Sequence, residues 1–155
     1  MKTLIAAAVL AVASTQVSAQ QLYGGATLDY GLAHSGDSQA AASLLIGGKA
    51  PFGRAVVYGV EGETGLRLFG ADDYDTTRLR GFAGYDVGGL EGRVSLGWSS
   101  LAEEDRTVTG YNFGFGLLRE VNANVTARAE LIRDIIDETG LSAVTTTRIG
   151  LTYGF

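Results

Sequence analysis

The sequence has 155 residues, of which 17 are acidic and 12 basic, and it contains no cysteine and one proline. Its net charge of −5 disfavours nucleic acid as a partner, because binding to phosphates requires a basic surface. Without cysteine, neither disulfides nor thiolate metal sites can stabilise the chain. The 23 glycines follow no three-residue period, which excludes a collagen-like chain, and their number disfavours long helices.

The first 19 residues are typical of a secretory signal peptide. Lys2 gives a positive start, residues 4–13 form an apolar run too short to span a membrane, and Val17-Ser18-Ala19 offers small residues for cleavage. These flanks disfavour the alternative of an N-terminal anchor helix. We therefore predict a signal peptide over residues 1–19, cleaved after Ala19, and one domain over residues 20–155. Loss of Lys2 leaves 11 basic and 17 acidic residues, a net charge of −6.

After residue 19, apolar and polar residues alternate with a period of two, which is typical of strands. No later stretch approaches the 18 or so consecutive apolar residues of a transmembrane helix. Residues 129–138 also have helical propensity, but we favour a strand that runs on into an acidic loop. The alternation predicts an all-β fold, an eight-stranded antiparallel up-and-down barrel, with strands at 22–32, 39–48, 55–69, 78–87, 92–100, 108–118, 125–132 and 143–155.

The charged residues of these segments fall on one side of the strands. They are five acids and six arginines, with no lysine: Asp29, Glu61, Glu63, Arg67, Arg78, Arg80, Asp86, Arg93, Arg128, Glu130 and Arg148. One arginine can bridge several carboxylates, and an eight-stranded barrel is just wide enough for side chains to fill it. We therefore expect a paired charge network inside a transmembrane β-barrel. The alternative is a soluble barrel that binds a hydrophobic ligand inside, but its solvated surface would normally contain lysine.

The other side of the strands is apolar and carries aromatic residues in two bands. Tyr58, Tyr85, Tyr153 and Phe155 lie near the end with the short turns, and Tyr30, Trp98 and Tyr111 lie near the end with the longer loops. Aromatic rings are enriched at the two interfaces of a bilayer. The two bands therefore predict aromatic belts that flank a lipid-facing apolar wall.

The chain ends on an alternating strand in which Ile149, Leu151, Tyr153 and Phe155 share the apolar side. This ending and the eight segments resemble the small bacterial outer-membrane β-barrels, the OmpX-like and opacity-type group often labelled a porin family. The resemblance implies an integral protein of a Gram-negative outer membrane, with lipid and lipopolysaccharide as partners and both termini in the periplasm. It also implies that these four residues belong to the signal read by the outer-membrane assembly machinery. Because a closed barrel has no free strand edge, we expect a monomer.

Three functions follow from this interpretation, and the first is a structural or surface-interaction role. Under the implied orientation, the loops near His34, Asp73, Glu104 and Asp137 are extracellular. They hold ten acids, offset by Arg106 and Arg133: Asp37, Asp72, Asp73, Asp75, Glu103, Glu104, Asp105, Asp134, Asp137 and Glu138. The cluster at Asp72, Asp73 and Asp75 lacks a complete coordinating motif for Ca²⁺ or Mg²⁺, so we expect no metal site and no cofactor.

The second function is a narrow pore for small solutes or cations, since glycines on the inner side could leave space beside fixed acids. The third is a lipid-modifying enzyme that uses His34, Ser35 and Asp37. Neighbours on one loop do not form a preorganised triad by themselves, and no matching motif is present. We therefore expect no catalytic residues and favour the first function.

Overall fold

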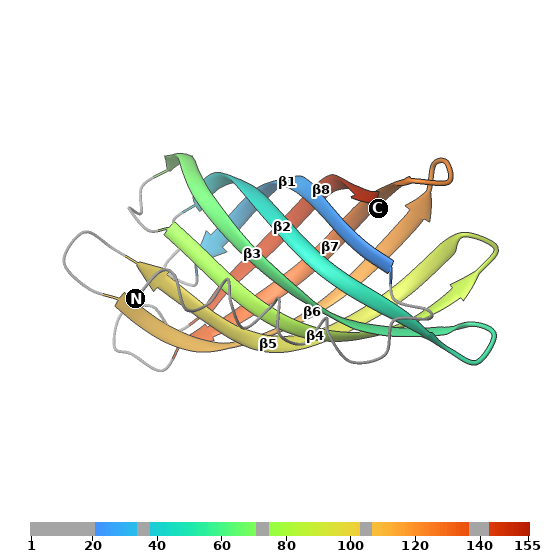
Figure 1. The fold of residues 1–155 in the computed structure, drawn as a ribbon. Coiled ribbons are helices and arrows are strands. Elements are labelled where there is room, and N and C mark those ends of the chain that lie inside the picture. The colour runs from blue at the N-terminus through green and yellow to red at the C-terminus, as the bar shows by residue number, and fades with distance from the viewer. Residues whose placement is uncertain (1–20, 34–37, 71–74, 103–106, 137–142) are drawn as a thin grey trace.

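Eight antiparallel strands close into one barrel in the computed structural model, which describes residues 21–33, 38–70, 75–102, 107–136 and 143–155. Each strand pairs with its neighbours in sequence, and β1 also pairs with β8 (Figure 1). The predicted all-β meander is therefore confirmed. The strands are β1 (Gln21–Ala33), β2 (Ser38–Phe52), β3 (Val56–Gly70), β4 (Asp75–Val87), β5 (Leu90–Ala102), β6 (Thr107–Glu120), β7 (Val125–Ile136) and β8 (Ala143–Gly154). The described residues include no helix long and apolar enough to cross a bilayer.

The strand direction places alternate side chains inside and outside the barrel. In β4 the buried side chains are those of Thr76, Arg78, Arg80 and Phe82. The side chains of Leu79 and Tyr85 point to the opposite face of the strand and are exposed. Among the described residues, 31 large apolar side chains are exposed and 11 hydrophobic residues are buried. The barrel is therefore polar inside and apolar outside, which contradicts the alternative of a soluble barrel with an apolar interior.

Short turns join the strands at the end where β8 terminates (Figure 1). The β4–β5 connection consists of Gly88 and Gly89 at φ 62° and 80°, and Gly53 in the β2–β3 turn has φ 75°. Positive φ at both central residues gives a type I′ hairpin turn, whose twist matches that of the strands. A two-residue hairpin turn therefore joins β4 to β5.

Two boundaries and one register differ from or refine the expectations. β2 runs on to Phe52 through the stretch expected to turn, and β7 is a strand to Ile136, as favoured over a helix. In the β2–β3 ladder, Ala41 pairs with Arg67 and Ala40 with Phe69, so Leu68 is an extra residue. Such a bulge reverses the alternation, and Phe69, which period-two counting places on the same side of the strand as Arg67, is exposed. The expected signal peptide lies outside the described residues.

Candidate functional site: a charge-paired lumen

The lumen is filled in layers. Near the loop end, Leu101, Val108, Ile136 and Val144 form a buried apolar cluster, and Tyr23, Leu45 and Phe82 form a second one nearer the turns. Charged side chains from β1, β3, β4, β7 and β8 lie in a layer of ion pairs. This layer is the candidate functional site, because it fills the lumen between the two ends of the barrel.

Arg148 of β8 is buried and joins three strands. Its Nη2 donates to Asp29 Oδ2 at 2.6 Å, and its Nη1 and Nη2 donate to Glu63 at 2.5 and 2.8 Å. Asp29 also accepts hydrogen bonds of 2.7 Å from Thr27 and Ser43. Because Asp29 and Arg148 are register partners, this ion pair lies on the ladder that closes the barrel.

Glu61, two residues before Glu63 on β3, is the centre of a second cluster. Arg128 Nη1 and Nη2 donate to its two carboxylate oxygens at 2.8 and 3.0 Å, and the Tyr23 hydroxyl donates at 2.9 Å. Arg80 Nη2 donates to both Glu61 and Glu63, and so connects the two clusters. A guanidinium is suited to such bridging because its five N–H groups lie in one planar fork.

Nearer the loop end, Arg78 and Asp134 form a bidentate pair across the lumen. Arg78 Nε and Nη2 donate to the two oxygens of Asp134 at 2.9 and 2.7 Å, and Nη1 donates to Glu63 at 2.7 Å. Toward the turns, Arg93 Nε donates to Glu91 at 2.7 Å, and its guanidinium carbon lies 3.7 Å from the centre of the Phe82 ring. Lys49 Nζ lies 3.6 Å from Glu91. The charge pairing thus extends over most of the length of the lumen.

The buried charges balance. Among the described residues, the buried acids are Asp29, Glu61, Glu63, Glu91, Glu130 and Asp134, and the buried arginines are Arg78, Arg80, Arg93, Arg128 and Arg148. These are six negative and five positive groups, and the partly buried Lys49 beside Glu91 supplies the sixth positive charge. Isolated ions are very costly to bury, and buried pairs need good geometry and further hydrogen bonds. The near balance of buried acids and bases therefore limits the free-energy cost of burying these charges.

Two glycines make room for the carboxylates. A Cβ on Gly84 would lie 2.7 Å from Glu91 Oε1, and a Cβ on Gly116 would lie 2.8 Å from Glu130 Cγ. Both contacts are closer than a side chain would tolerate. The space beside these two inner glycines is therefore filled by neighbouring acids. The pore interpretation needs open space beside the inner glycines, and Gly84 and Gly116 do not provide it.

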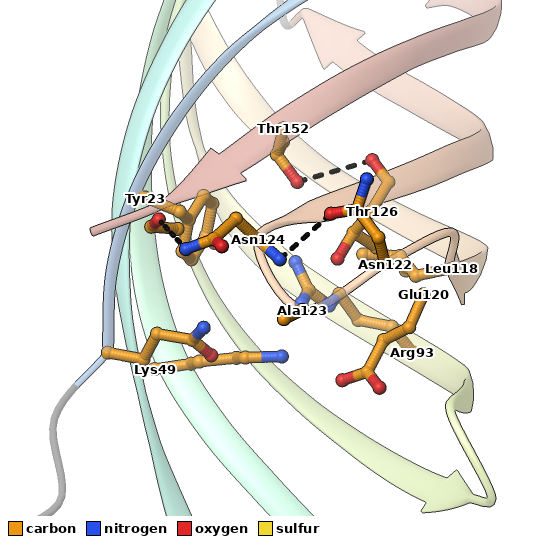
Figure 2. A pocket seen from close by; sticks show the side chains of 12 residues that line it. Tyr23, Lys49, Arg93, Leu118, Glu120, Asn122, Ala123, Asn124, Thr126 and Thr152 are labelled. Atoms are coloured by element: carbon orange, nitrogen blue, oxygen red, sulfur yellow. Dashed lines mark hydrogen bonds between the residues drawn. The ribbon is translucent and has the colours of Figure 1, made fainter.

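A recess opens at the turn end of the lumen, with about 420 Å³ of space that includes open solvent. Figure 2 shows Lys49 and Glu120 at its mouth and Asn122 and Asn124 along the β6–β7 turn. A smaller recess of about 250 Å³ toward the loop end is lined by Asp29, Gln39, Arg78 and their neighbours. The ion-pair layer lies between the two recesses.

Several buried guanidinium nitrogens of this layer have no hydrogen-bond partner among the described residues. They are Nε of Arg80, Arg128 and Arg148, and Nη1 of Arg80 and Arg93. Buried polar groups of this kind are commonly satisfied by ordered water. The layer is therefore well paired in charge but retains donors that water could use.

The structure places most of the expected interior charges in this layer, with two exceptions. Arg67 is exposed near the loop end, beside the Leu68 bulge, and Asp86 is only half-buried and accepts a hydrogen bond from the Gly89 backbone N–H in the turn. Glu91 and Asp134 were missed, Glu91 because β5 begins two residues earlier than expected and Asp134 because it was assigned to a loop. The inward parity of Asp134 with Arg128 and Glu130 was the signal that could have found it.

The residues expected to meet lipid lie on the outer wall. The wall includes the belt residues Tyr30, Tyr58, Tyr85, Trp98 and Tyr111 and the terminal set Ile149, Leu151, Tyr153 and Phe155. The rings of Tyr153 and Phe155 pack edge to face, with centroids 5.7 Å apart. His34, Ser35, Asp37, Asp72 and Asp73 lie outside the described residues.

We expect Arg148→Met to destabilise the barrel by about 3–5 kcal/mol, because Asp29 and Glu63 would keep buried charges with fewer partners. Arg119→Met is the matched control, since Arg119 is exposed and its one hydrogen bond to a described residue is to the Gly88 carbonyl at 3.3 Å. Urea unfolding of the refolded protein, followed by the mobility of folded and unfolded forms on a gel, measures both changes. Equal midpoints for Arg148→Met and Arg119→Met would contradict the role given to Arg148.

No protein-family model matches the sequence, and no curated protein matches it either. Among solved structures, Neisserial surface protein A is similar with a TM-score of 0.58 and 17% identity, over 89% of this chain and 98% of that one. Ail of Yersinia pestis, the attachment invasion locus protein, was solved in complex with the heparin analogue sucrose octasulfate. It is similar with a TM-score of 0.60 and 14% identity, over 88% and 97% of the two chains.

A de novo designed transmembrane β-barrel is similar with a TM-score of 0.53 and 15% identity, over 87% of this chain and 95% of that one. Identities this low concern the fold. The chain therefore has the fold of the small eight-stranded outer-membrane β-barrels.

Proposed function

We propose that the protein is an integral outer-membrane β-barrel whose function is structural or lies in surface interaction, with a lumen closed by its own ion pairs. The observation that carries the proposal is the nearly balanced set of six buried acids and five buried arginines, with Lys49 beside Glu91, inside an apolar wall. Soluble monomers rarely expose apolar patches larger than a few hundred Å². A lipid environment accounts for a wall on which apolar residues predominate from Leu22 to Phe155.

The orientation and the assembly signal belong to this proposal. A periplasmic position of the short turns and of Phe155 would place the four connections 34–37, 71–74, 103–106 and 137–142 outside the cell. In the sequence these connections hold eight acids and one arginine. Ail was solved with a polysulfated ligand, but a loop surface this acidic would repel a polyanion. We therefore propose a basic surface partner, if the loops bind one.

Cell fractionation tests the location. We expect the full chain in the outer-membrane fraction with heat-modifiable mobility on a detergent gel, since an intact barrel resists unfolding in detergent. Deletion of Phe155 should lower the amount inserted, because we propose that Ile149, Leu151, Tyr153 and Phe155 are read during assembly. Replacement of Phe52, an exposed aromatic at the same end, by Ala is the matched control and should leave the amount unchanged. Soluble periplasmic protein would contradict the location, and equal levels of the truncated and full chains would contradict the assembly signal.

A narrow pore is the second candidate, and the two recesses at opposite ends of the lumen favour it. The ion-pair layer between them argues against free diffusion, because each buried ion is held by partners from other strands. We expect the refolded wild-type protein to be silent in single-channel recordings across planar bilayers. Arg80→Ala, which removes the side chain that connects the Glu61 and Glu63 clusters, should produce cation-selective openings. Regular openings of the wild type would establish the pore and contradict the closed lumen.

A further inference from the structure

One cation lies within the apolar outer wall of the barrel. In the described strands, the outward rows contain three charged residues, Asp75, Arg119 and Arg133. Asp75 is the first residue of β4, and Arg119 is the last but one of β6. Arg133, which the sequence had suggested for a loop, is exposed on β7, with the apolar Ile135 farther toward the loops in the same row. Its position therefore calls for a physical reason.

Arg133 lies in a polar strip, which we define as Arg133, Thr145, Thr147 and Tyr30. Arg133 and Thr145 are register partners, and Arg133 Nη1 donates to Thr145 Oγ1 at 2.8 Å. Thr147 follows in the same outward row of β8 and is the register partner of Tyr30 on β1. Figure 1 shows β7, β8 and β1 side by side. The strip thus offers one guanidinium and three hydroxyl groups on adjacent strands of a wall on which apolar residues predominate.

A charged side chain that faces lipid is unfavourable near the membrane centre and becomes tolerable toward the interface. Phosphate oxygens complement a guanidinium, because two parallel N–H groups can donate to two oxygens of one phosphate. The hydrogen bond from Arg133 Nη1 to Thr145 holds the guanidinium beside the hydroxyl groups of the strip. An anionic lipid headgroup would neutralise Arg133, whose hydrogen-bond partner among the described residues is the hydroxyl of Thr145 and not an acidic side chain.

We propose that the polar strip binds a phosphate of lipid A in the outer leaflet. This inference rests on the proposed function, since it requires membrane insertion with the loop end outward. Lipid A carries its phosphates on sugars, and the sugar hydroxyls can exchange hydrogen bonds with Thr145, Thr147 and Tyr30. The strip lies in the half of the barrel nearer the loops, where a headgroup of the outer leaflet would meet the wall.

Native mass spectrometry of the refolded full chain in detergent micelles tests the site, with bisphosphorylated lipid A, dephosphorylated lipid A and phosphatidylglycerol as probes. We expect Arg133→Gln to weaken lipid A binding roughly tenfold, as loss of a charge-assisted contact implies. Arg133→Lys and Thr145→Val should weaken it less, and wild-type protein should prefer the bisphosphorylated form. Arg119→Gln, which removes the outward cation at the opposite end, is the matched control and should bind as wild type does.

The proposed site would be wrong if Arg133→Gln and Arg133→Lys both bound lipid A with wild-type affinity. Heat-modifiable mobility would confirm that both variants are folded. Equal binding of phosphatidylglycerol would overturn the assignment to lipid A. The mass-spectrometry experiment uses refolded protein in micelles and does not depend on insertion in the cell. A negative result there would contradict the lipid A site, whereas a negative fractionation result would contradict the proposed location.

Discussion

A narrow closed barrel with an apolar wall must neutralise its interior charges within itself, and the rest of this structure depends on that constraint. Six buried carboxylates face five buried arginines and Lys49 in the described lumen. Removing one partner of a buried pair leaves an uncompensated ion, so each charge is needed by the others. The same ion pairs lie between the two recesses of the lumen, and the closed lumen that we propose therefore depends on the interaction that stabilises the barrel.

The ion pairs and the strand register support each other. Glu61 is the register partner of Arg80, Glu63 of Arg78, and Arg148 of both Asp29 and Glu130. Opposite charges directly across an antiparallel ladder stabilise the pairing, and a slip by one residue would turn them toward lipid. The register of the closing ladder between β1 and β8 is thus specified by charge as well as by the apolar pattern.

Period-two alternation made the eight strands and the sidedness of most charges predictable from the sequence. Contacts between distant strands were less accessible to prediction: the parity of Asp134 indicates an inward side chain, but it does not indicate that Arg78, 56 residues away, binds it across the lumen. Arg67 is exposed, and the inside–outside alternation reverses at Phe69, beside the bulge at Leu68. The amino-acid pattern of β3 does not predict this bulge. Glu91 was predictable in principle, since a two-residue turn at Gly88-Gly89 requires β5 to begin at Leu90.

The central claim is that the outer wall meets lipid while the charges lie inside, and Trp98 reports on it directly as the only tryptophan of the chain. Its side chain lies on the outer face of β5, opposite Tyr111. In vesicles of phospholipids brominated on the acyl chains, the wild-type protein should show strongly quenched tryptophan fluorescence and little quenching by aqueous iodide. Strong quenching by iodide, with no effect of the brominated chains, would contradict the account.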